Sequence, residues 1–518
     1  MSKINNINQD IAPSFKDYLF QDHSNRTILW MAVISIFIQL IIFKYFYPYA
    51  SYIHGDSFVY LDTAYHNLSI NTYMIGYSMF LRAFSVFSSS DTVLAAFQYL
   101  LLQASALSLL LSIFYFYRPT KSTRFILLFF MVFNPLFLYL GNLVSSDAFF
   151  VALSLTWFTL LLWILHQPNP KLIILHTAVL FMAFTVRYNA LIYLFIAAMA
   201  FFLSGQHIRL QLVGLAASVV TIGLFILYTG SQYKALTGTW QYSPFAGWQW
   251  ANNAMYAYRY VNKADRQPVP GKFQPLDNMI REYFDSTRDI KKFPVEAAMA
   301  STFYMWSPSL PLFHYRDGLY KKDNTTPELK KWASMGPFYK SYGIYIAKHY
   351  PWHFIQYFLW PNANKYYAPP VEFLDSYNSS KDSVAPIASI WFGYKSLRVT
   401  TRTKDLKIHM LDFYPILSGI INVLMLFSLV FFLLLDGFKQ DILFRKGILL
   451  GAMLWLLNAG FTIFASSAAL RFQSFPILLT AVYAGLLIDW IAKIASIKKT
   501  IKMPATTLPR LPTEKSLV

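Results

Sequence analysis

Two carboxylates lie in the polar stretch that follows the first long apolar run of the chain. Asp56 stands in the sequence His54-Gly55-Asp56-Ser57, and Asp62 follows one to two helical turns later. A charged group beside hydrocarbon is costly, so one that is retained there usually has a function. An ionised carboxylate within about 3 Å of a hydroxyl can remove its proton, which makes Asp56 a candidate general base.

A simpler interpretation of Asp56 is structural. Aspartate is a preferred N-cap, and an amphipathic run follows it. The two roles are compatible, because a cap also holds a carboxylate in place. Asp62 is either part of the same site or a solvated residue.

Three further charged residues lie at the ends of later apolar runs. Asp147 follows Ser145-Ser146 at the start of the fourth run, where the helix dipole favours an acid and where a second carboxylate could orient the first or bind a cation. Arg187 ends the fifth run, where the dipole favours a cation. Arg471 opens the last run, where the dipole disfavours it, so an anion should compensate it: either a phosphate, which arginine binds in a bidentate fork, or a nearby acid.

Other groups that could serve a site are fewer. Arg82 and Lys365 are weaker candidates for binding phosphate. His349 and His353 are four residues apart, but Pro351 lies between them, so we predict no metal site there. Cysteine is absent, which excludes disulfides and cysteine-based metal sites.

Composition places these residues in a membrane protein. The 518 residues are 56% hydrophobic and 13% charged, against about 25% charged in soluble domains. The net charge of +19 would suit a nucleic-acid partner, but most basic residues fall in short loops between apolar runs. We therefore attribute the charge to topology and to anionic lipid, and expect no nucleic-acid partner.

Ten apolar runs are long enough to span a bilayer, at about 17–25 residues each. They start near Thr27, Asp91, Arg124, Ser146, Lys171, Asn189, Arg209, Phe413, Gly447 and Phe472. Three of the middle runs are short, and we expect breaks at Asn134-Pro135, at His176 and at Arg187.

The distribution of lysine and arginine orients these runs. Basic residues gather in alternate gaps and in the tail, whereas the short gaps on the other side hold only Arg187 and Arg471. The basic side carries Arg118, Lys121, Arg124, Lys171, Arg209, Lys439, Arg445, Lys446, Lys493, Lys498, Lys499, Lys502 and Arg510. This asymmetry predicts that both termini are cytoplasmic and that the five candidate residues Asp56, Asp62, Asp147, Arg187 and Arg471 lie on the outer side.

The predicted organisation is an all-α polytopic bundle with an outer mixed domain. A cytoplasmic segment covers 1–27. Seven spans and a first outer loop (48–90) occupy 28–229, the outer domain 230–412, three spans 413–492, and a cytoplasmic tail 493–518. Within the outer domain, 277–292 and 342–362 have helical patterns, and the last 20 residues are predicted to be disordered.

In order and topology, these motifs resemble the GT-C superfamily of membrane glycosyltransferases. The similarity is to bacterial relatives of the dolichyl-phosphate-mannose–protein mannosyltransferases and to the lipid A aminoarabinose transferase. It lies in Gly55-Asp56-Ser57 with Tyr60 and Ala64, Gly76-Tyr77-Ser78, Ser146-Asp147, Arg187-Tyr188-Asn189, His349-Tyr350-Pro351-Trp352, and Arg471-Phe472 followed by Pro476. Ser57 stands where many protein mannosyltransferases have glutamate, Ser78 where the family has proline, and Phe472 where it has tyrosine.

The resemblance implies an inverting enzyme in a bacterial inner membrane. It would move a sugar from a polyprenyl-phosphate carrier to a hydroxyl of a glycolipid, glycan or protein at the periplasmic face. Asp56 would be the base and Asp147 a second catalytic acid that orients the acceptor or helps to hold a divalent cation, which some relatives use. Arg471, with Arg187, Arg82 and Lys365, would bind phosphate, and Asp62, Tyr60 and Tyr77 would line the substrate site.

Three alternatives remain open at this point. A transporter or flippase of lipid-linked sugars would place charged residues near mid-membrane, whereas the acids here gather at one face. A polymerase or ligase of the O-antigen type would place arginine and histidine in its large outer loop. A membrane scaffold without enzymatic activity gives no reason for Arg471.

Overall fold

The computed structural model describes residues 14–286, 292, 296, 298, 300–323, 325–403, 405–440, 442–465 and 467–502. Within these ranges the protein is helical and has no strand, only three isolated β-bridges. The predicted all-α class is therefore confirmed. Of the last 20 residues, where we predict disorder, 499–502 belong to the final helix, so the prediction is wrong there, and 503–518 lie outside the described residues.

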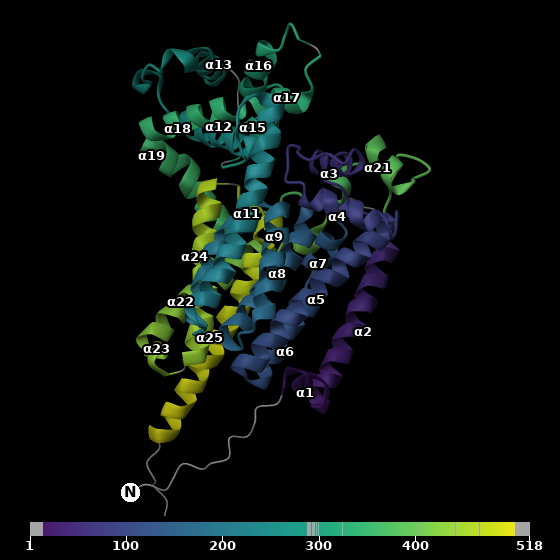
Figure 1. Ribbon diagram of the computed structural model, residues 1–518, viewed down its shortest axis with the longest axis vertical. Helices are drawn as coiled ribbons and strands as arrows, with labels where there is room; N and C mark the ends of the chain where they lie inside the picture. Colours follow the sequence, from purple (N-terminus) through teal and green to yellow (C-terminus); the bar gives the residue numbers. More distant parts are fainter. Residues whose placement is uncertain are drawn as a thin grey trace, which may run out of the picture.

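Long apolar helices form an elongated bundle (Figure 1). Eight helical stretches of the described chain are long and apolar enough to cross a membrane, so the protein is a multi-pass membrane protein by length and composition. Their helices are α2 (His23–Phe46), α5 (Asp91–Tyr117), α6 (Lys121–Val132) with α7 (Pro135–Gly141), α8 (Ser146–His166), α11 (Ile208–Thr237), η7 (His409–Leu411) with α22 (Tyr414–Leu434), α24 (Ile442–Ala465) and α25 (Leu470–Lys502).

Two shorter apolar helices complete the ten predicted runs. They are α9 (Pro170–Val186), and η1 (Tyr188–Ile192) with α10 (Tyr193–Leu203). The predicted breaks at Asn134, which caps α7, and at Arg187, which ends α9, are confirmed. The break predicted at His176 is wrong, because α9 continues through it and Trp157 of α8 donates to its ring at 3.0 Å.

Short polar motifs start several of these helices. The side chains of Ser90, Thr120, Asn134 and Ser145 accept hydrogen bonds from backbone N–H groups at the first turns of α5, α6, α7 and α8. Such caps satisfy donors that have no partner within the helix. They fix where each helix begins, and thus the level at which Asp147 enters α8.

A helical cap stands over one end of the bundle (Figure 1). It has its own aromatic core, and the upper part of α11 supplies Tyr233 to that core. Its elements are α12 (Pro244–Tyr258), η2 (Lys263–Asp265), η3 (Gly271–Phe273), α13 (Gln274–Asp285), α15 (Phe303–Trp306), α16 (Pro311–Leu319), α17 (Glu328–Ser334), α18 (Gly336–His349), α19 (Pro351–Phe354) and the π-helical η5 (Ile355–Leu359). The predicted boundary at 230 falls inside α11, and the expected mixed domain is helical over its described part.

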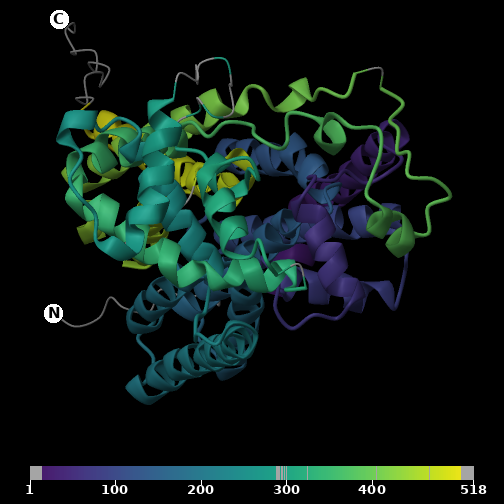
Figure 2. The ribbon, with the colours of Figure 1, turned by 90° about the horizontal axis from the view of Figure 1, so that it is seen from above.

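Two further segments lie at this end of the bundle. The first outer loop forms α3 (Asp56–Tyr65) and α4 (Gly76–Ser85). After α20 (Trp360–Tyr367), residues 368–413, which we call the strap, run along one edge toward α2 and α3 and contain η6 (Tyr377–Ser380) and α21 (Pro386–Phe392) (Figure 2). The opposite end of the bundle carries α1 (Phe15–Phe20) and α23 (Gly437–Gln440) (Figure 1).

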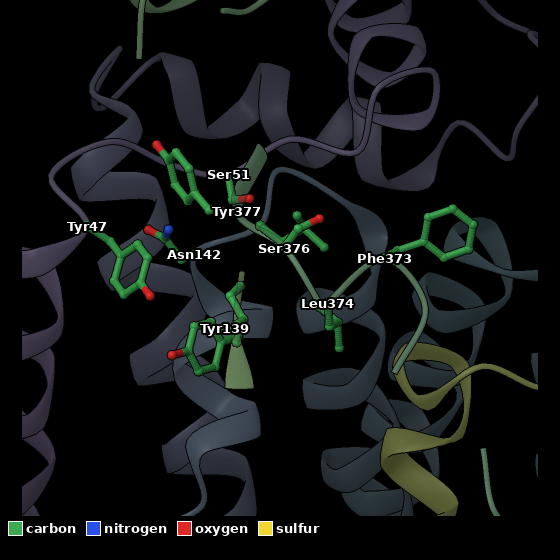
Figure 3. Close-up of a pocket in the computed structure, with 10 residues that line it drawn as sticks. Tyr47, Ser51, Tyr139, Asn142, Phe373, Leu374, Ser376 and Tyr377 are labelled. Carbon is green, nitrogen blue, oxygen red and sulfur yellow. The ribbon is translucent and has the colours of Figure 1, made fainter. Parts of the chain in front are cut away.

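The strap is hydrogen-bonded to the segment that precedes Asp56. Ser51 accepts from the backbone N–H of Asn378 at 2.9 Å, and Tyr377 donates to the carbonyl of Ala50 at 3.1 Å. The same contact region lines a small pocket, around which Tyr47, Tyr139 and Tyr377 lie together (Figure 3). The strap therefore fixes the position of the chain that leads into α3.

Close glycine contacts hold the cap helices together. A Cβ built on Gly247 of α12 would lie 1.9 Å from the carbonyl oxygen of Gly336, at the start of α18. We expect Gly247→Ala to destabilise the cap by about 1–3 kcal/mol through overpacking. Gly318→Ala in α16, where nothing lies within 4 Å, is the control and should be neutral or stabilising. Melting temperatures in detergent test this, and equal values for the two variants would contradict it.

Candidate functional site

A glycine turn places Asp56 at the start of α3. Gly55 has φ +106°, a conformation that favours glycine, and it occupies the N-cap position itself. The hydroxyl of Ser57 accepts from the backbone N–H of Ile53 at 2.9 Å, which closes the turn. Asp56 is therefore the first residue of the helix and not its N-cap, so the structural interpretation of its carboxylate is wrong in that form.

The carboxylate of Asp56 is held by two donors, one from the same outer loop and one from the last helix. The hydroxyl of Tyr73 donates to Oδ1 at 2.7 Å, and Nη2 of Arg471 donates to Oδ2 at 2.8 Å. The side chain is still 22% exposed. Asp56 thus has a fixed orientation and retains access to a ligand.

Asp147 is a carboxylate of a different kind. Its side chain has no exposed surface and accepts from Nη2 of Arg187 at 2.5 Å, from Nη1 of Arg471 at 3.3 Å and from the hydroxyl of Ser145. It also lies in the first turn of α8, where the helix dipole favours an acid. Because it is enclosed and bound by two guanidinium groups, Asp147 holds its neighbours in place.

Arg471 joins the two acids. Each terminal nitrogen of its guanidinium binds a different carboxylate, and Arg187 supplies the second positive charge. The charges of the two carboxylates and the two guanidinium groups cancel. Buried charges are tolerated when they are paired in this way. The competing explanation for the unusual position of Arg471, compensation by acids, is thus realised in the structure. Its assignment to phosphate stays a prediction.

Aromatic residues surround this charged cluster. Tyr60 shares a hydrogen bond of 3.1 Å with Ser146, and its ring packs on Tyr73 and Tyr77. Burial, and then the charge of Asp56, raise the pKa of Tyr60 to about 12, so it remains a neutral hydroxyl. Tyr77 is buried and donates to Gln98 at 2.9 Å, which makes it a link between α4 and α5.

The cap closes over the cluster from above. The rings of Phe245 and Trp306 pack on Tyr73, with centroids 6.2 and 5.9 Å away. Burial, and then Asp56, raise the pKa of Tyr73 well above its usual value, so Tyr73 stays a donor to Asp56. The site therefore combines residues of the bundle, the first loop and the cap.

Lys365 lies under the same part of the cap. Its ammonium is 3.5 Å from the carbonyl of Ala300 and 3.8 Å from Glu372 of the strap. Burial lowers its pKa, and Glu372 opposes this shift. Both contacts are long, so Lys365 has donor capacity left for an anion.

Two of the predicted site residues lie apart from the cluster. Asp62 is 46% exposed and pairs with His66 at 3.1 Å. Arg82 is exposed and donates to the carbonyl of Ala64 at 3.2 Å, where it caps the end of α3. Their contacts are local, and the structure does not bring them to Asp56.

The sequence did not identify two residues that the structure places here. Tyr73 is one of 36 tyrosines, and nothing in its neighbours distinguishes it. Phe373 of the strap covers the guanidinium of Arg471, with its ring centroid 4.4 Å from Cζ. No local sequence pattern marks either residue, since Tyr73 is 17 residues from Asp56 and Phe373 comes from the strap.

The two acids do not fit a divalent cation. Such an ion prefers several carboxylate or carbonyl oxygens, whereas both acids here are already bound by arginine. No group of three or more histidine and acidic side chains suited to a metal occurs in the described part of the chain. A cation would have to displace Arg471 and leave it buried and unpaired.

Comparison of the chain with known protein families, with curated proteins and with solved structures found no match.

The buried acid should be essential for stability. We expect Asp147→Asn to cost about 3–5 kcal/mol, because it leaves two buried guanidinium groups with one carboxylate. Asp62→Asn is the matched control and should change stability by less than about 0.5 kcal/mol, since its side chain is exposed. The measurement is the melting temperature of each purified variant. An unchanged value for Asp147→Asn would contradict the described role.

Proposed function

We propose that the protein is a membrane-embedded inverting glycosyltransferase that uses a polyprenyl-phosphate-linked sugar. The observation that carries the proposal is the pair of unlike carboxylates at one end of the bundle. Asp56 is oriented and partly exposed, whereas Asp147 is enclosed and neutralised. Two acids whose surroundings differ in this way often have different roles in a catalytic site.

Asp56 would act as the base. An alcohol is a poor nucleophile until a base takes its proton, and a positioned carboxylate can do so. The acceptor O–H proton passes to Asp56 while the acceptor oxygen bonds to the anomeric carbon. The bond from that carbon to the phosphate oxygen breaks, and the carrier phosphate leaves with the electron pair. Attack from the face opposite the phosphate inverts the configuration.

The departing phosphate needs a cation more than an acid, because it carries its own charge. Arg471 and Arg187 already balance the charges of Asp56 and Asp147, so their main effect is to orient the two acids. Lys365, with its two long contacts beneath the cap, is the better candidate for the phosphate. In this arrangement Asp147 is a positioning residue.

A lipid-linked donor agrees with the location of the cluster. The four charged residues lie where apolar helices end and the polar cap begins, so a carrier could keep its hydrocarbon in the bilayer. The lysine and arginine asymmetry supports cytoplasmic termini and a site on the outer face of the membrane. The resemblance implies that this is the periplasmic face of a bacterial inner membrane. The acceptor would be a glycolipid, a glycan or a protein.

Replacing the base tests the proposal. Proteoliposomes are supplied with a total polyprenyl-phosphate-sugar extract, and transfer is followed for wild type and Asp56→Asn. We expect transfer to fall by about 10²–10⁴-fold, since asparagine keeps the shape but cannot accept the proton. Asp62→Asn, at the exposed acid of the same helix, should keep full activity.

Two outcomes of this assay would contradict the proposal in different ways. A fully active Asp56→Asn would remove the proposed base. No transfer by wild type from any lipid-linked donor would contradict the transferase itself, and movement of the labelled lipid across the bilayer in the same vesicles would then support a transporter.

Lys365 gives a separate prediction. We expect Lys365→Met to raise KM for the lipid-linked donor roughly tenfold, because a phosphate loses a charged partner. Arg82→Met is the control, since Arg82 is exposed and bonds only to Ala64 in the described contacts. Initial rates at varied donor concentration separate KM from kcat. Equal effects of the two substitutions would contradict a phosphate role for Lys365.

A further inference from the structure

Phe373 is an exposed aromatic residue in a backbone conformation that suits glycine. Its φ is +68°, and the residue is 43% exposed. It occupies the third position of a turn closed by the hydrogen bond from Leu374 N–H to the carbonyl of Val371, at 2.9 Å. A positive φ at that position favours glycine or asparagine, and a bulky residue there is strained.

The turn is held directly beside Arg471. The carbonyl of Pro370 accepts from the backbone N–H of Leu470 at 2.9 Å, which fixes the strap to the start of α25. Figure 3 shows the ring of Phe373 turned away from the group of Tyr47, Tyr139 and Tyr377. Phe373 is one of the residues that line the tyrosine pocket, and its ring lies over the guanidinium of Arg471.

The ring ends a stack of alternating aromatic and cationic groups. Phe373 lies 4.4 Å from Cζ of Arg471, whose other neighbour is Phe472, also at 4.4 Å. Phe472 in turn lies 4.9 Å from Arg187, and Arg187 lies 5.5 Å from Phe150. Phe150 is buried, and Arg471 is only 5% exposed, so the outer face of Phe373 is the accessible end of the stack.

Phe373 is linked to the proposed base through Arg471. The guanidinium on the inner face of its ring is the one that donates to Asp56, so Arg471 connects Phe373 with that carboxylate. On its other oxygen Asp56 is bound by Tyr73, against which Trp306 of the cap packs. A ligand at Asp56 therefore meets an aromatic residue of the strap and another of the cap.

We propose that Phe373 is the stacking platform for the ring of the sugar that is transferred. This inference rests on the proposed function and adds a binding surface to it. A sugar ring presents C–H groups on one face and hydroxyls around its edge, so it stacks on an aromatic ring while its edge reaches polar groups. The guanidinium behind Phe373 holds the ring flat against the cluster. Glycine or asparagine would relieve the backbone strain at this position, but neither would offer an aromatic face to the sugar.

Four variants test the platform by lipid binding in nanodiscs. The probes are a panel of undecaprenyl-phosphate hexoses and pentoses, and undecaprenyl phosphate without a sugar. We expect Phe373→Leu to bind the preferred sugar-bearing lipid roughly three- to tenfold more weakly than wild type, and the bare lipid equally well. Phe373→Tyr should keep both affinities. Phe413→Leu, the same change at an exposed phenylalanine at the far end of the strap, is the control and should also keep both.

The melting temperature of Phe373→Gly separates a binding role from a packing role. Glycine removes both the ring and the strain, whereas leucine removes only the ring. We therefore expect Phe373→Gly to melt at a higher temperature than Phe373→Leu while binding the sugar equally weakly. A melting temperature no higher than that of Phe373→Leu would contradict the strained platform.

The outcomes distinguish this inference from the proposed function. Equal weakening of the sugar-bearing and bare lipids in Phe373→Leu would show that the ring contacts the prenyl chain or the phosphate, and would overturn the platform alone. Unchanged affinity for both lipids would overturn it as well. If wild type binds every sugar-bearing lipid no better than the bare one, the proposed function fails, and the platform fails with it.

Discussion

The site depends on one guanidinium shared by two carboxylates. Arg471 enters at the N-terminal end of a helix, where the dipole opposes a positive charge, and it is almost completely buried. It remains ionised there because Asp147 anchors one terminal nitrogen and Asp56 the other. If either contact were absent, a buried charge would lose its partner, which is among the most destabilising changes in a protein interior. The first loop, α8 and α25 are therefore constrained to one arrangement by a single side chain.

The same contact gives the two acids different character. Asp147 is surrounded by protein donors and is committed to holding Arg187 and Arg471. Asp56 receives one nitrogen of Arg471 and one hydroxyl from Tyr73, and it keeps an exposed side. An oriented, partly exposed carboxylate can accept a proton from a ligand, whereas an enclosed one can only hold its neighbours. The structure thus gives the two acids different surroundings, where the sequence shows only two aspartates at helix starts.

Much of this architecture was predictable from local patterns. The apolar runs predicted the membrane helices, and the Gly55-Asp56-Ser57 and Ser145-Ser146-Asp147 motifs located the acids, because caps and turns depend on adjacent residues. Alternation of basic residues indicated that Asp56, Asp147, Arg187 and Arg471 share one end of the bundle, and all four are in contact. Asp62 was a misleading candidate for the site, because it is near the site in sequence but pairs with His66 instead. The helix break predicted at His176 was wrong, because this buried histidine accepts a hydrogen bond from Trp157 and the helix continues. The roles of Tyr73 and Phe373 depend on pairings across the chain, which local spacing does not contain.

The two acids that bind Arg471 are synthesised long before Arg471 itself. Asp147 and Asp56 precede it by 324 and 415 residues, so at the usual rate of synthesis Asp147 waits about 15–65 s for this arginine to emerge. For most of that time the enclosed acid has only Arg187 as a cationic partner in the cluster, and until residues 368–413 are made the segment before Asp56 also lacks the strap that fixes it. Completion of the site is therefore one of the last events in biogenesis. A chain truncated before α25 would insert most of its helices into the membrane and still leave a polar, incompletely paired cleft in the bundle, a feature by which quality control could recognise it.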